Sequence, residues 1–562
     1  MAKSRIPLLY VIDSRKNRVG NYPEEALFYL EKDTWNDFGF LTTYHLHVSG
    51  ELTDDGKAAL IGFVRILRKG QTSSDTFQLK VGPLAPLNEE FCSMSNSLDY
   101  YERIAQLPHR YRDRILIALR DLVIYPEIKE EFKREPGFNK SLMRSTNSED
   151  ELFDLAPLLI SRDFHKLLEL DLNFEFSIPE MDKPLIFNFD SPKYGFEEKS
   201  LPNRLAVVIG RNGSGKSTLL SRIARVAYAS ATNRKDRWLK QVGIISPPGL
   251  GFSRVILLSY SAFDAFTTPG IYKSEKETIV SEMKNGLGRY VFCGIRDIVA
   301  ELEETLPDLD TDDTGKLGRK DILADRTENT ILKPIAGLAA EFVRNIRIIE
   351  ELEAEELLGQ ALKRLSEEKS MRNLLPVDNK LTEMTGRGLE KFFMQLSTGH
   401  KFVLHSVTCI IAYAAPRSLL LFDEPETHLH PPILAALMKT IRYILDKRNA
   451  FMIVATHSPV VLQETLKRHV YVIRREGDFM AANEPPVETF GENVGILAQM
   501  AFGLTSDVTD YHDTLDKLVK AYSDEDFGPQ TPEAKLAAIE QHFPDGLSIQ
   551  ARSYILSKIY KR

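Results

Sequence analysis

The stretch LAVVIGRNGSGKSTLL, residues 205–220, decides the fold of this chain. It opens with an apolar run that predicts a buried strand, and the residues after 216 predict an amphipathic helix. Between them lies the pattern GxxxxGK[ST], in which glycines let backbone N–H groups turn inward around phosphate oxygens. The helix N-terminus adds partial positive charge to this cradle. The stretch therefore predicts a phosphate-binding loop and not merely a glycine-rich turn at the end of a strand.

The predicted nucleotide site is made of consecutive residues of this loop. Lys216 would reach the β- and γ-phosphates, and the Ser217 hydroxyl would hold Mg²⁺. The predicted cofactors are therefore ATP and Mg²⁺. The loop residues expected to contact ATP are Gly210, Arg211, Asn212, Gly213, Ser214, Gly215, Lys216, Ser217 and Thr218.

Two further apolar strands are expected to deliver polar residues to the same edge of a parallel sheet. SLLLFDEPE, residues 418–426, ends in Asp423, a candidate metal ligand, and Glu424, a candidate general base or orienter of the attacking water. Alone, such a pair could simply cap a loop. FMIVATHSP ends at His457, which could hydrogen-bond a γ-phosphate, although a lone histidine at a strand end is more often structural.

The stretch MQLSTGHK, residues 394–401, predicts a second anion site whose expected donors include no charged side chain. Ser397 lies where the N-cap of the following apolar helix belongs. Its hydroxyl, the Gly399 N–H and the helix dipole favour an anion. Because the chain already has its own phosphate loop, we expect this element to close over the ATP of a second subunit.

Composition limits the classes of function. The 562 residues are 43% hydrophobic and 27% charged, as in a globular protein of several domains. The net charge of −8 argues against a surface coated with nucleic-acid-binding charge, although a local basic groove is allowed. No membrane-length apolar run or secretion signal is recognised. Cys92, Cys293 and Cys409 lie far apart and predict neither a disulfide framework nor a zinc pair, so a cytoplasmic location is expected.

The predicted fold class is α/β, a strand-rich core with an antiparallel β-subdomain, interrupted by helical insertions. TTYHLHV, ALIGFVRIL and TFQLKV predict a β-meander between residues 40 and 82. The expected parts are a β-rich part (1–97), a helical insertion (98–182), the phosphate-loop part (183–268), a helical arm (269–390), the part with Ser397, the acidic pair and His457 (391–485), and a helical partner-binding tail (486–562).

These motifs resemble those of the ABC-type ATPase heads of the SMC, Rad50 and OLD group. GRNGSGKST matches Walker A, LSTGH the signature, LLLFDEPE Walker B, THLHP the D-loop, and His457 the switch histidine. The resemblance implies an ABC-type P-loop ATPase that hydrolyses ATP slowly, as a regulatory step. Two departures stand out. Thr398-Gly399-His400 replaces the Gly-Gly-Gln of transporters, and no Q-loop glutamine follows RVILLSYSAFDAF, where Ser261 is only a weak positional candidate.

The overall plan is similar to PtuA, the ATPase subunit of Septu-type and retron-associated antiphage systems. That similarity implies an ATP-sandwiched homodimer or higher oligomer that controls a separate HNH nuclease, PtuB-like. In retron versions it also implies a reverse transcriptase and its msDNA as partners, with nucleic acid as a further contact and no membrane. Two other hypotheses stay open: a DNA-repair ATPase of the RecF or SMC type, and a scaffold that ATP stabilises without functional turnover.

Weaker features receive plainer interpretations. A built-in Toprim nuclease is not expected, because Glu476 reads as a hairpin turn and Asp524 and Asp526 follow no apolar strand. The basic segment NRKDRWLK, residues 233–240, could grip a nucleic-acid backbone, but a solvated helix surface is favoured. His45 and His47 share one strand face without carboxylates nearby in sequence, so an exposed strand face is favoured over a metal site.

Overall fold

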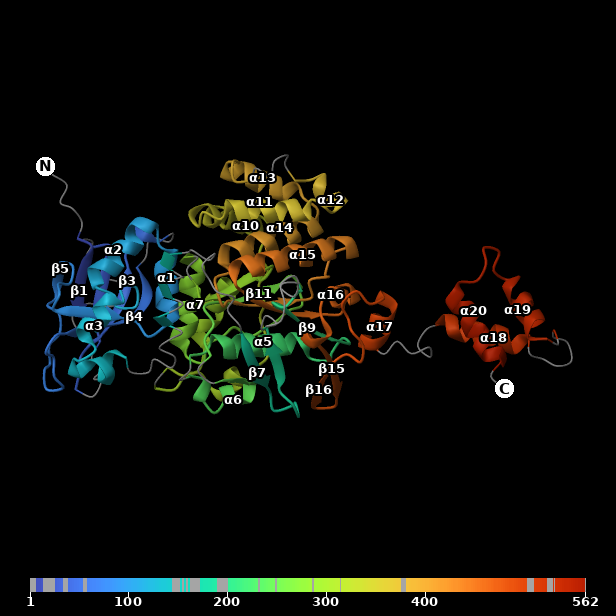
Figure 1. Ribbon diagram of the computed structural model, residues 1–562, viewed down its shortest axis with the longest axis horizontal. Helices are drawn as coiled ribbons and strands as arrows, with labels where there is room; N and C mark the ends of the chain where they lie inside the picture. Colours follow the sequence, from blue (N-terminus) through green and yellow to red (C-terminus); the bar gives the residue numbers. More distant parts are fainter. Residues whose placement is uncertain are drawn as a thin grey trace. The chain divides into compact units, whose positions relative to one another are not determined.

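The computed structural model divides into two compact units, Met1–Gly491 and Glu492–Arg562 (Figure 1). The residues it describes are 7–13, 26–33, 39–53, 58–143, 152–153, 156–157, 160–161, 172–189, 201–230, 233–247, 250–285, 288–313, 315–375, 381–502, 510–522, 529 and 531–560.

The first unit is built around a seven-stranded sheet in the order β12-β11-β13-β14-β9-β15-β16. Its neighbouring strands are parallel except for the final β15–β16 hairpin. All residues of the first five strands in this order are buried, which explains why they read as continuous apolar runs. The strands are β9 (Leu205–Gly210), β11 (Val255–Ser259), β12 (Tyr290–Gly294), β13 (Leu419–Asp423), β14 (Phe451–Thr456), β15 (Val470–Glu476) and β16 (Phe479–Asn483).

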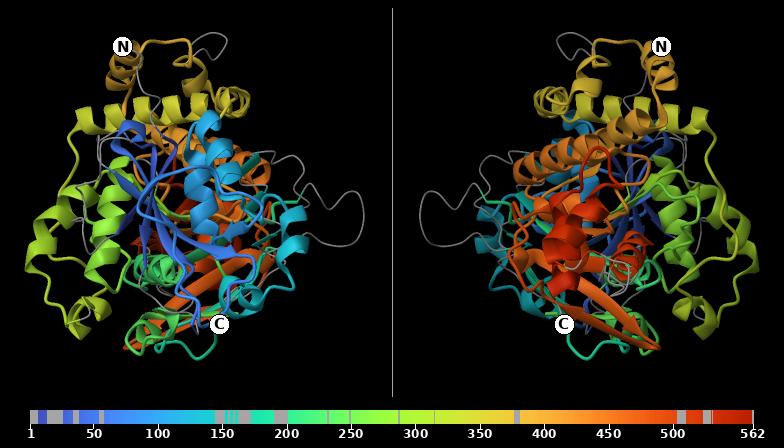
Figure 2. Two further views of the ribbon diagram at one scale, coloured as in Figure 1. Left: turned by 90° about the vertical axis from the view of Figure 1, so that its left-hand side faces the viewer. Right: turned by 90° about the vertical axis from the view of Figure 1, so that its right-hand side faces the viewer.

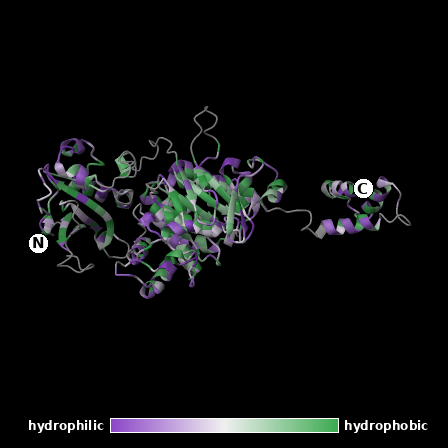
Figure 3. Cartoon of the chain, turned by 90° about the horizontal axis from the view of Figure 1, so that it is seen from below, coloured by the Kyte–Doolittle hydropathy of each residue, from purple (hydrophilic) through white to green (hydrophobic). Residues whose placement is uncertain are grey.

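Helices cover both faces of this sheet. α5 (Lys216–Tyr228) packs on one face, against β9, β11, β13 and β14. α14 (Thr398–Tyr413) and α15 (Pro431–Arg448) lie together on the other face (Figures 1 and 2). Figure 3 shows hydrophobic residues gathered on the strands between these layers. The phosphate loop and the helix that follows LSTGH therefore start in different layers.

A small antiparallel sheet, β10-β7-β8, extends the core beneath α5. Its strands are β7 (Asn173–Ser177), β8 (Leu185–Asn188) and β10 (Ile244–Ser246), and the four-residue helix α6 (Leu239–Val242) precedes β10. Phe174, Phe176 and Phe187 share one hydrophobic core with the inner residues of α5 and β9. This is the antiparallel β-subdomain expected from the sequence, although β7 lies inside the segment 98–182 that was predicted to be helical.

Residues 9–160 contain a second sheet with its own core. The order is β5-β1-β2-β3-β4-β6, antiparallel except for β1 and β2. Helices α1, α2 and α3 share a core with it, so the predicted boundary at residue 97 falls inside one packing unit. The elements are β1 (Leu9–Asp13), β2 (Phe28–Lys32), β3 (Thr43–Val48), β4 (Ala59–Arg68), β5 (Gly82–Leu84), β6 (Phe91–Met94), α1 (Leu98–Gln106), α2 (His109–Leu119), α3 (Glu127–Phe132) and a π-helical turn (Phe138–Leu142).

The predicted meander is wrong in one part. TFQLKV forms no strand; the neighbouring strand is β5, which begins at Gly82. The backbone of this segment instead bonds to side chains, since the Leu79 N–H donates to the Tyr44 hydroxyl at 2.9 Å and the Phe77 N–H to Asp75 Oδ1 at 3.0 Å. Side-chain partners of this kind compete with a strand ladder for backbone groups.

Buried ion pairs join the two cores of the first unit. Arg254 Nε lies 2.6 Å from Glu102 Oε1, with both side chains at most 5% exposed, and Arg103 pairs with Glu282. Both pairs connect α1 to the ATPase core. Because an isolated charge at such a depth is costly, the pairs hold α1 in one place against that core.

The segment 269–390 is helical but contains β12, which pairs with β11. α10 packs on α13 and α14, and α11 packs on α15, so these later helices of the arm lie on the α14–α15 side of the sheet (Figure 2), whereas α9 packs on α6. Its helices are α7 (Lys273–Asn285), α8 (Ile298–Thr305), α9 (Arg319–Leu323), α10 (Ile335–Glu351), α11 (Glu355–Leu365), α12 (Lys369–Arg372) and α13 (Gly386–Gln395).

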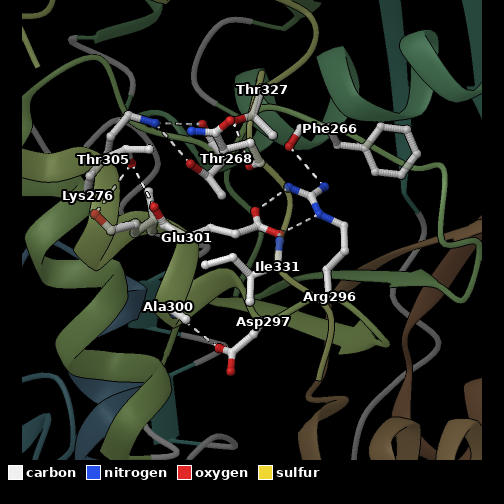
Figure 4. A network of polar contacts seen from close by, with 12 residues as sticks. Phe266, Thr268, Lys276, Arg296, Asp297, Ala300, Glu301, Thr305, Thr327 and Ile331 are labelled. Carbon is white, nitrogen blue, oxygen red and sulfur yellow. Dashed lines mark hydrogen bonds and ion pairs between the residues drawn. The ribbon is translucent and has the colours of Figure 1, made fainter. Parts of the chain in front are cut away.

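A buried polar network fixes the chain that leaves β11 (Figure 4). Arg296, 1% exposed, donates from Nε to Glu301 Oε1 at 3.0 Å, from Nη2 to Glu301 Oε2 at 2.5 Å, and from Nη1 to the Phe266 carbonyl at 3.1 Å. Beside it, Lys276 Nζ donates to Thr268 Oγ1 at 2.9 Å. Burial lowers the pKa of Lys276 to about 7. The network therefore holds the loop that runs from β11 past the ATP site.

Cys293 and Cys409 form a disulfide between β12 and α14, with Cα atoms 6.5 Å apart. The sequence-based expectation of no disulfide is thus wrong for this pair. Its members are 116 residues apart and meet only because the sheet and the helix on its face pack together. No described helix has the length and apolarity needed to cross a membrane.

The described helices of the second unit are α17 (Val494–Phe502), α18 (Asp510–Ala521), α19 (Pro532–Glu540) and α20 (Ile549–Tyr560), whereas the short α16 (Pro459–Gln463) belongs to the first unit. α18, α19 and α20 share a small core of Leu515, Leu536, Ile539 and Ile555.

Candidate ATP site

The glycine loop joins β9 to α5 in the arrangement that phosphate binding needs. Gly213 and Gly215 have φ of 78° and 96°, a region that favours glycine, and Gly215 caps α5. Lys216 begins the helix and is buried; its Nζ donates to the carbonyls of Gly210 at 3.0 Å and Arg211 at 3.2 Å. Burial lowers the pKa of Lys216. The cradle thus holds its lysine over the loop.

The acidic end of β13 meets this loop. Ser217 Oγ donates to Asp423 Oδ1 at 3.1 Å, although the two residues are 206 positions apart. Asp423 is 3% exposed, and burial, together with the nearby Asp264 carboxylate, raises its pKa well above the ordinary value. The structure therefore places the two predicted metal ligands, Ser217 and Asp423, side by side.

Asp264 is a site residue that the sequence analysis missed. It follows β11 in the loop that the Arg296 network holds, and its Oδ2 is buried without a hydrogen-bond partner among the described residues. Burial, then the charge of Glu424, raises the pKa of Asp264 from 3.8 to about 7. In the sequence, Asp264 is the acidic residue of SYSAFDAF. For that segment the sequence analysis considered only a Q-loop glutamine, with Ser261 as a weak positional candidate.

Glu424 and His457 lie together at the ends of β13 and β14. Glu424 has φ of 46°, a strained value for a side-chain-bearing residue and one typical of functional sites. His457 Nδ1 lies 3.6 Å from Glu424 Oε1. The favourable interaction between these two groups lowers the pKa of Glu424 and raises that of His457. The two residues thus couple the candidate base to the predicted switch.

Glu426 is a second residue that the sequence analysis did not identify. Its Oε1 accepts the His457 N–H at 2.6 Å and lies 3.2 Å from His457 Nδ1, and it also accepts the Thr456 hydroxyl at 2.8 Å. Glu426 therefore anchors both the backbone and the ring of His457. Glu424 and Glu426 flank Pro425, and both reach His457. The sequence did not reveal this contact, because Glu426 and His457 are 31 residues apart.

The residues present fit a nucleotide with Mg²⁺. The buried Ser214 Oγ, like Asp264 Oδ2, has no hydrogen-bond partner among the described residues. The hydroxyl of Ser217 and the carboxylates of Asp423 and Asp264 are the oxygen donors that Mg²⁺ prefers. When bound, Mg²⁺ would neutralise charge on the phosphate oxygens and relieve the repulsion that raises both carboxyl pKa values.

LSTGH forms the start of α14, as predicted. Ser397 is the N-cap; its Oγ accepts the His400 N–H at 3.4 Å and lies 2.6 Å from His400 Nδ1. A Cβ on Gly399 would lie 2.9 Å from the His428 carbonyl, so the loop after β13 passes directly over it. His400 Nε2 lies 3.3 Å from Ser370 Oγ at the start of α12. The signature loop is thus held by the helical arm and by the loop that carries His428.

Ser397 and Lys216 belong to opposite layers of the fold. Lys216 opens α5 on one face of the sheet, while Ser397 opens α14 on the other. Ser397 is exposed, as are Arg211 and Asn212 in the phosphate loop. Thr218 follows Ser217 in the first turn of α5 and is partly buried. Within one subunit, the phosphate loop contacts Asp423 through the hydrogen bond from Ser217.

The other segments weighed from sequence have structural roles where they are described. Arg234, partly buried, donates to the carbonyls of Val226 at 2.8 Å and Ala227 at 2.9 Å, which explains part of the basic segment 233–240. Trp238 is stacked between Arg237 and Arg319. Glu476 pairs with Phe479 in the β15–β16 hairpin. Asp524 and Asp526 lie outside the described residues.

Comparison with known proteins agrees with this geometry. Residues 303–463 match the family described as "AAA domain, putative AbiEii toxin, Type IV TA system". That span includes Ser397, the acidic pair and His457. The chain is an ATP-binding P-loop ATPase of the ABC type, and the presence of this domain implies ATP hydrolysis.

Two solved structures are also similar, at low TM-score. An SMC head bound to the C-winged helix domain of ScpA is 13% identical with a TM-score of 0.26, and covers 56% of this chain and 97% of that one. A metal-chelate type ABC transporter in an inward-facing conformation is 15% identical with a TM-score of 0.25, and covers 56% and 84%.

One relative matches nearly the whole chain. Protein ea59 of Escherichia phage lambda is 30% identical over 502 residues, which cover 88% of this chain and 90% of the relative. The match therefore extends far beyond the ATPase motifs. The chain belongs to the family of phage lambda protein ea59.

Proposed function

We propose that this protein is an ATP-dependent switch in which two copies close around two ATP molecules and hydrolysis opens them again. The observation that carries the proposal is the placement of Ser397 at an exposed helix start in the layer opposite Lys216. In a single subunit, the phosphate loop has no LSTGH helix start closing over it, and that helix start has no phosphate to bind. In a two-fold pair, the helix start of each copy closes over the phosphate loop of the other copy.

The residues of the site have distinct tasks in hydrolysis. The loop and Lys216 bind the phosphates, and Ser217, Asp423 and Asp264 hold the metal ion. Glu424, whose pKa stays low, is the base that orients and deprotonates the attacking water. His457, held by Glu426, donates a hydrogen bond toward the γ-phosphate. The strained backbone of Glu424 sets the direction of its carboxylate.

Hydrolysis in this scheme is slow and regulatory. The lid contributes a neutral hydroxyl, a backbone N–H and a helix N-terminus, with no arginine in LSTGH to stabilise transition-state charge. ATP binding therefore holds the pair closed for a long time, and loss of the γ-phosphate releases it. Such a cycle suits control of a partner more than continuous work.

The partner we propose is a separate nuclease subunit of the HNH class, in a defence complex directed against phages. Support comes from the family description, which names an abortive-infection toxin, and from a relative that is itself phage-encoded. The second unit, Glu492–Arg562, is the proposed attachment point, because it is a separate compact unit in which α18, α19 and α20 have a core of their own. A retron reverse transcriptase with its msDNA would be an additional partner of the same complex.

The mass of the nucleotide-loaded protein tests the switch. Glu424→Gln keeps the size of the side chain and removes the base, so ATP with Mg²⁺ should trap it as a dimer in light scattering. Lys216→Ala should stay monomeric under the same conditions. A Glu424→Gln chain that stays monomeric with ATP bound would refute the sandwich. A dimer whose biological activity does not change with Glu424→Gln would instead support the ATP-stabilised scaffold.

A further inference from the structure

Two strands of the N-terminal sheet bring histidines and carboxylates together on one face. β2 and β3 pair antiparallel, with Glu31 opposite His45 and Tyr29 opposite His47. Leu30, Tyr44 and Leu46 alternate with these residues and enter the core shared with α1–α3. Glu31, His45 and His47 therefore point to the other face, away from those helices.

The donor atoms of this cluster are close to one another. One ligand atom each from Glu31, His45 and His47 lie within 4.8 Å of one another. His47 Nε2 is 3.0 Å from Glu31 Oε2, and His45 Nε2 is 3.2 Å from Asp33 Oδ2. The ligand atoms of Glu31, His45 and His47 thus converge on one small volume, which is where a shared cation would be bound.

The cluster is better sheltered than a surface ion pair. The side chains of His47 and Glu31 are 10% and 13% exposed, and those of His45 and Asp33 are 29% and 25% exposed. The Phe63 ring packs edge-on against His45, with centroids 4.5 Å apart. The Phe63 ring and the partial burial of the side chains limit the access of water to the cluster, so a bound cation would displace few water molecules.

We propose that Glu31, His45 and His47 form a binding site for a divalent transition-metal ion, with Asp33 positioned to hold the His45 ring. Two imidazole nitrogens and a carboxylate oxygen are a donor set that suits Zn²⁺ and its first-row neighbours. With neutral histidines, the nearby carboxylates of Glu31 and Asp33 carry two negative charges, which match one divalent ion. Sequence alone argued against this site because the carboxylates lie 12 to 16 residues from their histidines. The antiparallel register between β2 and β3 closes that gap.

The charge of the site also explains why two histidines and two acids share one strand pair. Four polar groups packed on a half-buried sheet face lose hydration. A metal ion bound by Glu31, His45 and His47 would also tie β2 to β3. The site is independent of the ATP chemistry, since every ligand belongs to the N-terminal sheet.

Zn²⁺ binding by the untagged full-length protein tests the proposal. After treatment with EDTA and in excess Mg²⁺, the wild-type chain should bind one Zn²⁺ more than the His45→Ala/His47→Ala variant in calorimetry. Co²⁺ as a probe should give the visible absorption of a low-coordinate nitrogen–oxygen site in the wild type only. The His428→Ala/His430→Ala variant, which keeps the cluster, is the matched control and should behave as the wild type does.

Equal Zn²⁺ stoichiometry in the wild type and the double variant would overturn the proposal. Glu31→Gln guards against an unfolded variant, because it keeps the side-chain size and should weaken Zn²⁺ binding at least about tenfold while the protein stays folded. Unchanged affinity in a folded Glu31→Gln chain would likewise contradict it. Neither outcome depends on ATP turnover, which the proposed switch requires and this site does not.

Discussion

Replacing Asp264 by Asn should stabilise the nucleotide-free protein and weaken its response to Mg·ATP. In the structure, this carboxyl group shares the site with Asp423 and Glu424 and has an orphaned buried oxygen. Without a metal ion, its charge is desolvated and repelled. Asn removes that charge and keeps the shape. With Mg·ATP the sign reverses, because Asn is a weaker metal ligand than a carboxylate.

The magnitude follows from the pKa of Asp264. A rise from 3.8 to about 7 corresponds to about 4 kcal/mol, at about 1.4 kcal/mol per pH unit. Because the folded state binds the proton more tightly, stability falls as the pH rises from 4 toward 7, and above 7 the whole penalty is present. Asp264→Asn should therefore raise the free energy of unfolding by about 4 kcal/mol at pH 8, and by about 2 kcal/mol at pH 5.

Urea unfolding in EDTA at the two pH values measures this difference. Exposed Asp308→Asn is the matched control and should change neither value. A second series with Mg·ATP should show a smaller ligand-induced stabilisation for Asp264→Asn than for the wild type. If Asp264→Asn destabilises the nucleotide-free protein at pH 8, or if its effect is equal at both pH values, the assignment of Asp264 to the metal site is wrong.

Three further changes probe other parts of the account. Arg296→Met leaves Glu301 charged and buried, so the free energy of unfolding of the ATPase unit, measured in urea, should fall by about 3–5 kcal/mol. Adding Glu301→Leu should restore part of that loss. If the effects of the two substitutions simply add, the pairing is contradicted. Gly399→Ala places a Cβ 2.9 Å from the His428 carbonyl, which disturbs the start of α14. ATP-dependent dimerisation, measured by light scattering, should therefore weaken at least about tenfold in a folded chain. Unchanged dimerisation would refute the close packing. His457 has a raised pKa, so the stability that its charged form contributes is present below pH 6.5 and is lost as the pH rises through the folded pKa. His457→Gln should therefore lower the melting temperature more at pH 6 than at pH 8.5. An equal effect at both pH values would contradict this.

Sequence patterns predicted the local structure of the phosphate loop and of the Ser397 helix start. The phosphate loop lies between β9 and α5 because six buried residues and an amphipathic helix flank consecutive glycines. Ser397 was recognised as an N-cap for the same reason, since its partner, the His400 N–H, is three residues away. In each case the neighbours that determine the conformation are adjacent in the chain.

Contacts between distant segments could not be predicted in this way. Asp264 joins Asp423 only because β11 and β13 pair in register, with Ser259 opposite Asp423. β12 was hidden inside a helical segment because YVFCG is short and has no alternating pattern. The Cys293–Cys409 disulfide depends on that strand and on the packing of α14 above it.

The N-terminal sheet shows the same limit on a different scale. β1 (LYVID) and β2 (FYLEK) were not recognised from the sequence. Without β2, Glu31 and Asp33 could not be placed beside His45 and His47. Pairing between strands, which a single sequence does not reveal, therefore decided the interpretation of both clusters.

Mixing two defective chains tests most directly whether each ATP is held between two subunits. Lys216→Ala removes the cradle lysine and Ser397→Arg blocks the lid, so each chain alone should have lost ATP turnover. A mixed dimer has one complete site, whereas neither chain alone can form one, so part of the wild-type turnover should return in an equimolar mixture. A Ser397→Arg chain that turns over ATP at the wild-type rate by itself, or a mixture no faster than its separate components, would contradict the account.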